Sequence, residues 1–483
     1  MQQVELGQGR FDIASKKKKK KVQEKERIMS IRIIGIDLGV SAKHKAMILD
    51  PASNEFIGKK VIFRARPGEL ERLLQRARAG APEDVEVVAI MEATGMAWYP
   101  VGVYLHRQGV TVYRVNGQKT KDLRQVLWKH AASDRIDSRV LAHLYQLAPD
   151  RLTAWWPVTG EQLALQRACR AYAYWREQDI ALQNRLQAYD QWAWDGLGKV
   201  VPAVAQRWMR QHWYNPWQVQ AAGAAHLVAA WQAASPQQPA DTDWIARWLA
   251  RAQEMTTLYG SEEMVGYEDL QAIMGHSLTL LDQYNQEQER LTQEKIEPLY
   301  RRLYPDCPLT TIYGIGLQSA AIYRAFIQHI DRFSMVEKFR LWCGIVPGSK
   351  QSGEAEAKGL HITQAGPNLV KATLYFNAEV ARQWDVQLAA IYHKQMVNYG
   401  KHHIQAVCAC ASHLANRIYA VLKQNRPYQL RDLDGKPITI EQSRELCKQF
   451  RVPDEVRQRN NKRFRRARAE QKAEAQAQRQ QRR

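Results

Sequence analysis

The sequence predicts an α/β domain, a long-helix region and a mainly helical C-terminal domain. In the first part, short apolar runs recur with amphipathic stretches between them. The runs lie at 31–50, 60–64, 85–91 and 110–115, and the stretches at 69–79 and 99–108. Strands that alternate with helices indicate a sheet with covered faces. After about residue 160 the strand pattern disappears, which indicates a helical remainder.

A helix over about 134–147 is expected to close the α/β domain. Beyond it, the segments 161–190 and 276–304 are charged and helically periodic, and we interpret them as two long helices of coiled-coil type. They bracket a Trp-rich stretch at 191–270, and 11 of the 15 Trp lie between 155 and 248. Their helical spacing favours core packing; stacking on nucleic-acid bases is the alternative.

A third unit is expected from about Pro305, with helices at 335–343, 367–385 and 401–424. Gly314 and Gly316 belong to a GxGxxxA pattern that is typical of a helix-hairpin-helix-like motif. Glycines let a backbone approach a phosphate closely, and a helix N-terminus favours an anion. The predicted domains are 1–28, 29–150, 151–304, 305–425 and 426–483.

The net charge of +21 indicates a polyanionic partner. Residues 16–27 carry +6 and residues 456–483 carry +9, so the two ends supply +15 of this charge. We expect both ends to be solvated, disordered arms that contact phosphates without reading sequence. A purely solubilising tail is the alternative.

Composition favours a cytoplasmic protein. The six cysteines show no CxxC pair and no framework spacing, as expected for a reduced protein. No stretch approaches the roughly 18 apolar residues that a membrane span needs. The lysine-rich start lacks the apolar segment of a signal peptide.

Four carboxylates form the main candidate site. Asp37 and Glu92 each end an apolar run, while Asp134 and Asp137 stand three apart on a predicted helix and therefore share a face. One such carboxylate alone would be a helix cap or a surface group. Crowded carboxylates raise one another's pKa, whereas a hard divalent cation such as Mg²⁺ prefers oxygen ligands. The set predicts a site for Mg²⁺ or Mn²⁺.

Ser352 is the second candidate. It lies in a Gly-flanked segment, PGSKQSG at 347–353, and Lys350, Lys358 and Lys371 are nearby in the sequence. A serine in this setting could attack a phosphodiester if its alkoxide were stabilised. A turn serine and a phosphate-contacting hydroxyl are the alternatives, and Ser349 is a competing candidate.

A dense group of histidines and cysteines follows at 402–413. Cys408 and Cys410 differ by two, so a helix would direct them to different faces, and the spacing matches no structural zinc site. We interpret this segment as a core helix.

The two constellations together resemble the IS110-family transposases, or DEDD recombinases, and the related site-specific DNA invertases. The resemblance spans roughly 30–425 and rests on GIDLGVSAKH, IMEATG and the segment around ASDRIDSR, then on TTIYGIG, WCGIVPGSKQSG and HITQAGPNLVKATLY. It implies an RNase H-like (RuvC-like) fold for the first domain. It also implies that Asp37, Glu92, Asp134 and Asp137 bind metal and that Ser352 is the nucleophile.

By the same resemblance, the carboxylates of one domain and the serine of the other form a composite site. The enzyme would cut and rejoin DNA as a homo-oligomer, a dimer or tetramer, guided by a structured non-coding RNA. It would be a bacterial cytoplasmic protein that associates with the nucleoid when active. Candidate phosphate contacts are Gly314, Gly316, Lys350, Lys358 and Lys371.

Two other functions remain open. A RuvC-like endonuclease for Holliday junctions would use metal and water without a covalent intermediate. A non-enzymatic nucleic-acid-binding scaffold would need none of the four carboxylates for its function.

Overall fold

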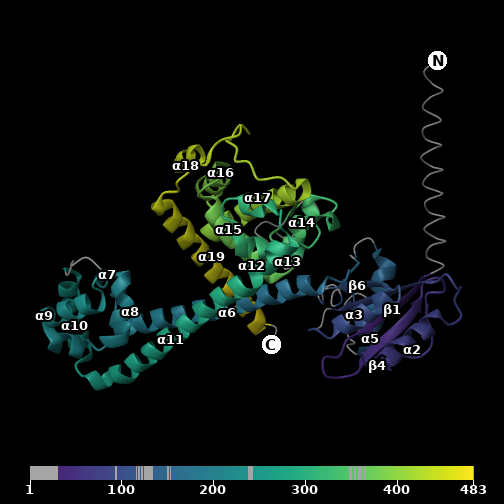
Figure 1. Cartoon of the computed structure of the whole chain (residues 1–483), viewed down its shortest axis with the longest axis horizontal. Helices are drawn as coiled ribbons and strands as arrows, with labels where there is room; N and C mark the ends of the chain where they lie inside the picture. The colour runs from purple at the N-terminus through teal and green to yellow at the C-terminus, as the bar shows by residue number, and fades with distance from the viewer. Residues whose placement is uncertain are drawn as a thin grey trace, which may run out of the picture. The chain divides into compact units, whose positions relative to one another are not determined.

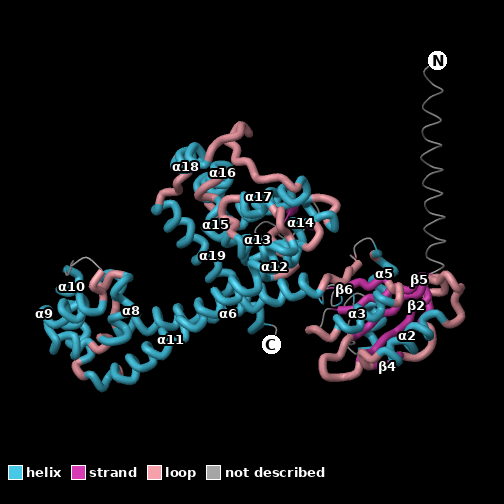
Figure 2. Tube along the Cα trace, in the orientation of Figure 1, coloured by secondary structure: helices cyan, strands magenta, loops and turns pink. Residues whose placement is uncertain are grey.

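A computed structural model shows a chain that divides into two compact units, at Val158 and Thr159 (Figure 1). The structure describes residues 31–481 with internal gaps. These gaps are 93–94, 116, 118–119, 121–122, 124–133, 150–151, 153, 238–242, 347–350, 353–354, 357–361 and 364–365. Side chains at 134–136, 351–352 and 355–356, and several after 470, also lie outside the description. Unit 1 contains the large sheet, and unit 2 is almost entirely helical (Figure 2).

Unit 1 is built on a mixed sheet of order β3-β2-β1-β5-β6, in which β4 also pairs with β2. β1 runs antiparallel to β2 and parallel to β5, and β5 runs parallel to β6. The strands are β1 (Ile31–Asp37), β2 (His44–Asp50), β3 (Glu55–Phe56), β4 (Val61–Phe63), β5 (Glu86–Glu92) and β6 (Thr111–Val115). The predicted α/β class is confirmed, and only the two-residue β3 has no counterpart in the prediction.

Helices cover both faces of this sheet. α2 (Pro67–Arg78) and α3 (Trp98–Arg107) share a core with Ile34 and Ile36 of β1. α5 (Asp134–Leu147) packs on the other face, where Leu141 joins Ile31 and Ile33. Alternate residues of one strand thus enter different cores, which is why β1 is an almost continuous apolar run.

Two long helices form the axis of unit 2, as predicted. α6 (Gly160–Ala193) packs along α11 (Tyr267–Leu291), and a π-helical turn (Thr292–Ile296) continues α11 into α12 (Glu297–Leu303). Thr159 caps α6 by accepting a 3.1 Å hydrogen bond from the Gln162 backbone NH. Trp175 and Tyr284 stack across the pair, with ring centroids 5.6 Å apart.

The Trp-rich insertion is a helical lobe with a core of its own. It comprises α7 (Leu197–Val200), α8 (Ala203–His212), α9 (Pro216–Ala234), α10 (Asp243–Tyr259) and a 3-10 turn (Glu262–Met264). Trp194, Trp231, Trp244 and Trp248 are buried in this core. The Trp194 indole NH donates to the Tyr214 carbonyl at 2.7 Å. The interpretation of these tryptophans as core residues is confirmed.

The C-terminal part of unit 2 packs shorter helices around α17. Its 3-10 helices span Pro308–Thr311 and Ile330–Arg332, and a π-helical turn spans Lys394–Asn398. The remaining elements are α13 (Leu317–Ile327), α14 (Val336–Cys343), β7 (Gln351–Ser352), β8 (Ala355–Glu356), α15 (Asn368–Ala381), α16 (Val386–His393), α17 (His403–Gln424), α18 (Ile440–Lys448) and α19 (Asp454–Gln481).

The prediction of a disordered C-terminal arm is wrong for residues 454–481, which form α19. The segment is rich in Ala, Gln, Arg and Glu, which are strong helix formers. Tertiary contacts at its first turns add to this propensity. The N-terminal arm lies outside the described residues.

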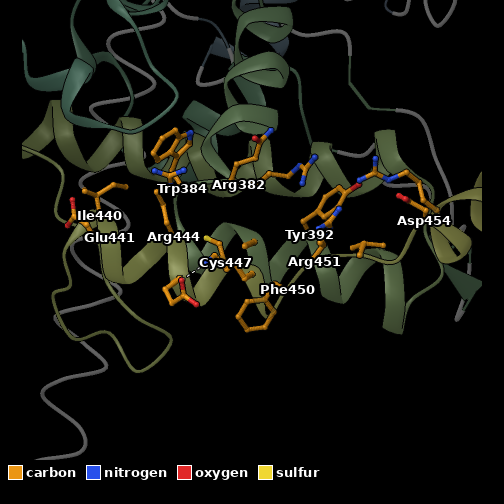
Figure 3. A pocket seen from close by; sticks show the side chains of 16 residues that line it. Arg382, Trp384, Tyr392, Ile440, Glu441, Arg444, Cys447, Phe450, Arg451 and Asp454 are labelled. Carbon is orange, nitrogen blue, oxygen red and sulfur yellow. Dashed lines mark hydrogen bonds and ion pairs between the residues drawn. The ribbon is translucent and has the colours of Figure 1, made fainter. Parts of the chain in front are cut away.

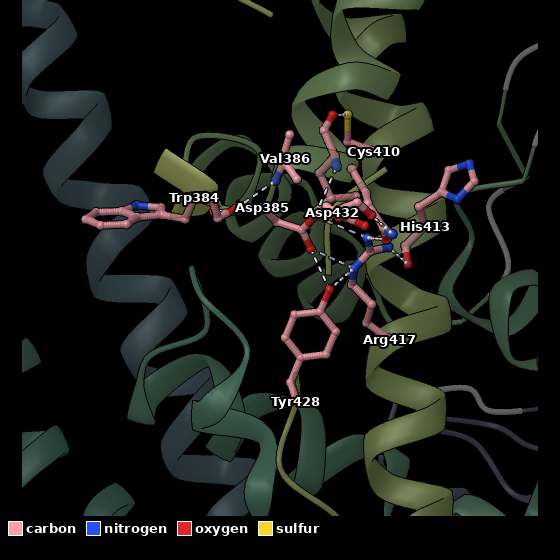
Figure 4. Close-up of polar contacts among 11 residues, drawn as sticks. Trp384, Asp385, Val386, Cys410, His413, Arg417, Tyr428 and Asp432 are labelled. Carbon is pink, nitrogen blue, oxygen red and sulfur yellow. Dashed lines mark hydrogen bonds and ion pairs between the residues drawn. The ribbon is translucent and has the colours of Figure 1, made fainter. Parts of the chain in front are cut away.

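A buried ion pair joins α16 to α17 (Figure 4). Asp385, the N-cap of α16, accepts from the Arg417 guanidinium at 2.9 Å and from the Tyr428 hydroxyl at 2.6 Å. Asp385 also accepts from the Leu388 backbone NH at 3.2 Å. Because both charges have several hydrogen bonds, the pair fixes the relative position of the two helices rather than leaving a buried charge unpaired.

Candidate active site

Asp37 and Glu92 end two adjacent parallel strands. The register of β1 and β5 pairs Ile36 with Met91, so the next residues, Asp37 and Glu92, come side by side at the carboxyl edge of the sheet. Strand side chains alternate between faces, which places both carboxylates on the face covered by α5.

A glycine brings α5 onto this face at close range. A Cβ at Gly35 would lie 2.0 Å from the Ser138 carbonyl oxygen and 2.7 Å from the Ala142 nitrogen. Only a residue without a side chain permits such an approach. The contact places Asp137, the neighbour of Ser138, beside the strand that ends in Asp37.

The electrostatics of Asp37 reflect this assembly. Burial raises the pKa of the Asp37 carboxyl most, and the negative charges of Asp137 and Glu92 raise it further. Lys45, which pairs with Asp37 across β1 and β2, lowers the pKa. Two of the other three predicted carboxylates therefore act electrostatically on Asp37.

Asp134 is the first residue of α5, one turn before Asp137. The backbone thus places it on the same helix as predicted, while its side chain lies outside the described part. Among the described side chains, no three His, Cys, Asp or Glu residues form a metal-binding cluster.

The chemistry of the described donors fits a divalent cation. Asp37, Glu92 and Asp137 supply only carboxylate oxygens, the ligands that Mg²⁺ prefers. Burial first, and then the negative charges of Asp137 and Glu92, raise the pKa of Asp37, and a bound cation would offset this penalty on the ionised carboxylate.

Gly117 is a site residue that the sequence did not reveal. A Cβ there would lie 2.5 Å from Oε1 of Glu92, so the Gly117 backbone lies directly against this carboxylate. No spacing pattern marks Gly117. Gly35, in contrast, interrupts an apolar strand, and such a glycine indicates close approach of another backbone.

Ser352 lies in a short hairpin of unit 2. β7 and β8 pair antiparallel, with Ser352 opposite Ala355. The structure does not describe the Ser352 side chain or the residues Ser349, Lys350 and Lys358, so their roles stay predictions. Lys371 is half-buried on α15.

Gly366 fixes the segment that leads from this hairpin into α15. Its φ of +68° belongs to the left-handed region, and a Cβ would lie 1.7 Å from the Trp342 carbonyl oxygen. Both features require glycine at this position. This contact holds the start of α15 beside the end of α14.

The loop with Gly314 and Gly316 joins a 3-10 turn to α13. Gly314 has φ of +90°, and its carbonyl accepts from the Asn377 amide at 2.6 Å. The Tyr323 hydroxyl donates to the other end of that amide at 2.7 Å. A Cβ added to Gly316, the N-cap of α13, would meet no atom within 4 Å. The element before the loop is a four-residue 3-10 turn, so the helix-hairpin-helix assignment stays a prediction.

The histidines and cysteines at 402–413 belong to the core helix α17, as interpreted, except His402, which is its N-cap. Cys410 is buried and donates to the Leu388 carbonyl at 3.5 Å. Nδ1 of His403 lies 2.8 Å from the Tyr392 hydroxyl. Burial raises the pKa of the Cys410 thiol to about 12, which disfavours the thiolate that metal binding needs.

Comparison with known proteins supports the same grouping of motifs. Residues 34–189 match the family model of DEDD transposases of the IS110 type, described as "Transposase". Residues 307–393 match the model described as "Transposase IS116/IS110/IS902 family". The matched ranges contain the four carboxylates and Ser352, respectively.

One curated relative is an "Insertion element IS110 uncharacterized 43.6 kDa protein" of Streptomyces coelicolor. It is 25% identical over 146 residues, which is 30% of this chain and 35% of the relative. The chain therefore aligns with about a third of that protein's length. No helix in the described part of the chain is long and apolar enough to span a bilayer.

Proposed function

The chain belongs to the IS110 family of transposases, and we propose that it cuts and rejoins DNA as a transposase or site-specific recombinase. The observation that carries this proposal is that Asp37 and Glu92 end adjacent parallel strands, and that Asp137 lies near enough to raise the pKa of Asp37. Neighbouring carboxylates of this kind suit phosphoryl transfer, whereas a binding scaffold has no need for them.

The sheet supports an RNase H-like assignment for unit 1. Its first strand is central, antiparallel to the second and parallel to β5, and helices cover both faces. Asp37, Glu92, Asp134 and Asp137 would hold Mg²⁺ or Mn²⁺. When bound, the cation would stabilise negative charge on the phosphate and on the oxygens that enter and leave.

Ser352 supplies the nucleophile in this proposal. Its Oγ loses a proton and attacks the phosphorus, which forms an Oγ–P bond while one P–O bond to deoxyribose breaks. The departing deoxyribose oxygen takes up a proton. In the rejoining step, a deoxyribose hydroxyl of the new partner loses its proton, attacks the phosphoserine and releases Ser352. The phosphate diester is conserved, so no energy source is required.

The remaining parts of the proposal concern partners. Gly314, Gly316, Lys350, Lys358 and Lys371 would contact phosphates. A structured RNA would select the DNA partners, and the net charge of +21 is compatible with an RNA-bound enzyme. The long helices α6 and α11 would support the homo-oligomer that strand exchange needs.

The test is detection of a covalent protein–DNA adduct. The purified protein is incubated with DNA of its element, Mg²⁺ and the flanking transcript, and adducts that survive denaturation are measured. Ser352→Ala and Asp37→Asn should each abolish them. Glu86→Gln, on the neighbouring strand β5, is the control for Asp37→Asn and should retain adducts. Ser349→Ala tests the competing serine of the same segment and should also retain them.

Three other outcomes would redirect the assignment. Normal cleavage by Ser352→Ala would rule out the serine nucleophile and favour a metal-dependent junction endonuclease. Cleavage that survives Asp37→Asn would rule out the carboxylate site. Binding without any cleavage by the wild-type protein would favour a scaffold.

A further inference from the structure

The helix α19 has one face docked on unit 2. Val456, Asn460 and Phe464 are spaced four apart and therefore lie on this face. Val456 packs against the core of unit 2. The centroid of the Phe464 ring lies 3.6 Å from the centroid of the His402 ring. The Asn460 amide donates to the carbonyls of Met396 at 2.7 Å and Lys401 at 3.1 Å. The first half of α19 is thus held firmly in place.

The outward side of the same helix carries a cationic stripe. Four exposed residues at spacing i, i+3, i+4 and i+7 form it: Arg459, Lys462, Arg463 and Arg466. No acidic residue occurs between 456 and 469. Arg466 pairs with Glu470 at 3.0 Å, but an exposed pair of this kind is weak and exchanges readily for a phosphate.

More cations lie on α18, on the segment that leads into α19 and in the first turn of α19. Arg444, Lys448, Arg451 and Arg457 line a pocket of about 750 Å³ between the end of α15, α16 and the α18–α19 segment (Figure 3). Acidic side chains also line it and offset part of this charge. Within the stripe, the exposed Arg466–Glu470 pair offsets only one of the four charges, so charge complementarity to an anion is stronger there than at the pocket.

We propose that the cationic stripe of α19 binds double-stranded DNA. A single rigid helix with cations along one side fits the B-DNA major groove, which is about 12 Å wide. The major groove of A-form RNA is deep and narrow and does not admit a helix. The binding is phosphate-directed and independent of base sequence. The stripe contains none of the predicted catalytic residues, so DNA binding by the stripe does not depend on catalysis.

Binding of a labelled DNA duplex of about 30 base pairs tests this, measured by fluorescence anisotropy across a salt series. EDTA is present, so cleavage plays no part. The test variant of the full chain replaces the stripe with glutamine: Arg459→Gln, Lys462→Gln, Arg463→Gln and Arg466→Gln. A control variant loses the same charge at exposed sites elsewhere in unit 2: Lys199→Gln, Arg247→Gln, Lys295→Gln and Lys436→Gln.

The stripe variant should bind at least tenfold more weakly at moderate salt. Its slope of log affinity against log salt should fall by about 3–4, because each phosphate contact contributes about 0.9. The control variant should change much less. Equal losses in both variants would reduce the effect to overall charge and overturn the proposal, as would unchanged binding by the stripe variant. A larger loss on an RNA duplex of the same sequence would show that RNA is the partner instead.

Discussion

At the residue scale, the ionisation of Asp37 couples the stability of unit 1 to pH. Burial and the nearby carboxylates raise the pKa of Asp37 above its ordinary value of 3.8. Between these two pKa values the folded protein binds more protons than the unfolded chain, so stability falls as pH rises through that window. Above the window, the ionised carboxylate costs folding free energy.

We therefore expect Asp37→Asn to stabilise the protein at pH 7 in EDTA. The unfolding temperature of unit 1 should rise by roughly 1–3 °C, since about 1 kcal/mol corresponds to 2–4 °C in a domain of this size. The gain should shrink as pH falls through the raised pKa of Asp37 toward the ordinary value of 3.8, because wild-type Asp37 then takes up its proton. Asp84→Asn, at an exposed loop position, is the control and should have little effect. A lower unfolding temperature for Asp37→Asn at pH 7 would contradict this account.

At the element scale, the contact between β1 and α5 determines where Asp137 lies. Gly35→Ala would place a methyl group 2.0 Å from the Ser138 carbonyl oxygen, so α5 must move away from the strand. We expect a loss of about 1–3 kcal/mol in the free energy of unfolding, the usual cost of overpacking. Urea unfolding measures it.

Gly68→Ala provides the matched control, because a Cβ there meets no atom within 4 Å. It should change stability by less than about 0.5 kcal/mol. The displacement of Asp137 should also weaken the stabilisation of Gly35→Ala by Mg²⁺. If Gly35→Ala were as stable as wild type, the packing of α5 against β1 would be wrong.

The elements that the sequence predicted well share a strong apolar period. The run that ends at Asp37 and the run that ends at Glu92 are buried on both faces, so burial and strand pairing agree with the local pattern. Helix α5 follows from its amphipathic spacing. The juxtaposition of Asp37, Glu92 and Asp137 follows from these elements once β1 and β5 are adjacent and parallel.

Features set by tertiary contact were not predicted. Nothing near Gly117 in the sequence indicates that its Cα faces Glu92, because the contact joins residues of two different strand ends. The helical state of α19 was missed because its charge suggested solvation. Asn460 and Phe464 supply the docking contacts, and their partners lie about 60 residues earlier in the chain.

At the scale of the whole molecule, the two units have separate cores. One core of unit 1 lies between the sheet and helices α2 and α3, and the other lies beneath α5. In unit 2, α6 contributes Leu165 and Cys169 to the C-terminal core and Leu186 and Ala193 to the core of the Trp-rich lobe. Separate cores predict separate unfolding transitions, because cooperativity follows shared burial.

Calorimetry of the full chain should therefore show at least two unfolding transitions. A substitution in unit 2 and Mg²⁺ binding to unit 1 should each shift a different one. Trp248 is fully buried and stacks on Trp244 with centroids 5.8 Å apart. Trp248→Ala should destabilise unit 2 by about 3–5 kcal/mol and leave the unit 1 transition unchanged. Millimolar Mg²⁺ should instead raise only the unit 1 transition, because ligands stabilise the unit that binds them. Trp192→Ala, at a half-exposed position, is the control. A single transition that both changes move together would show that the units unfold as one.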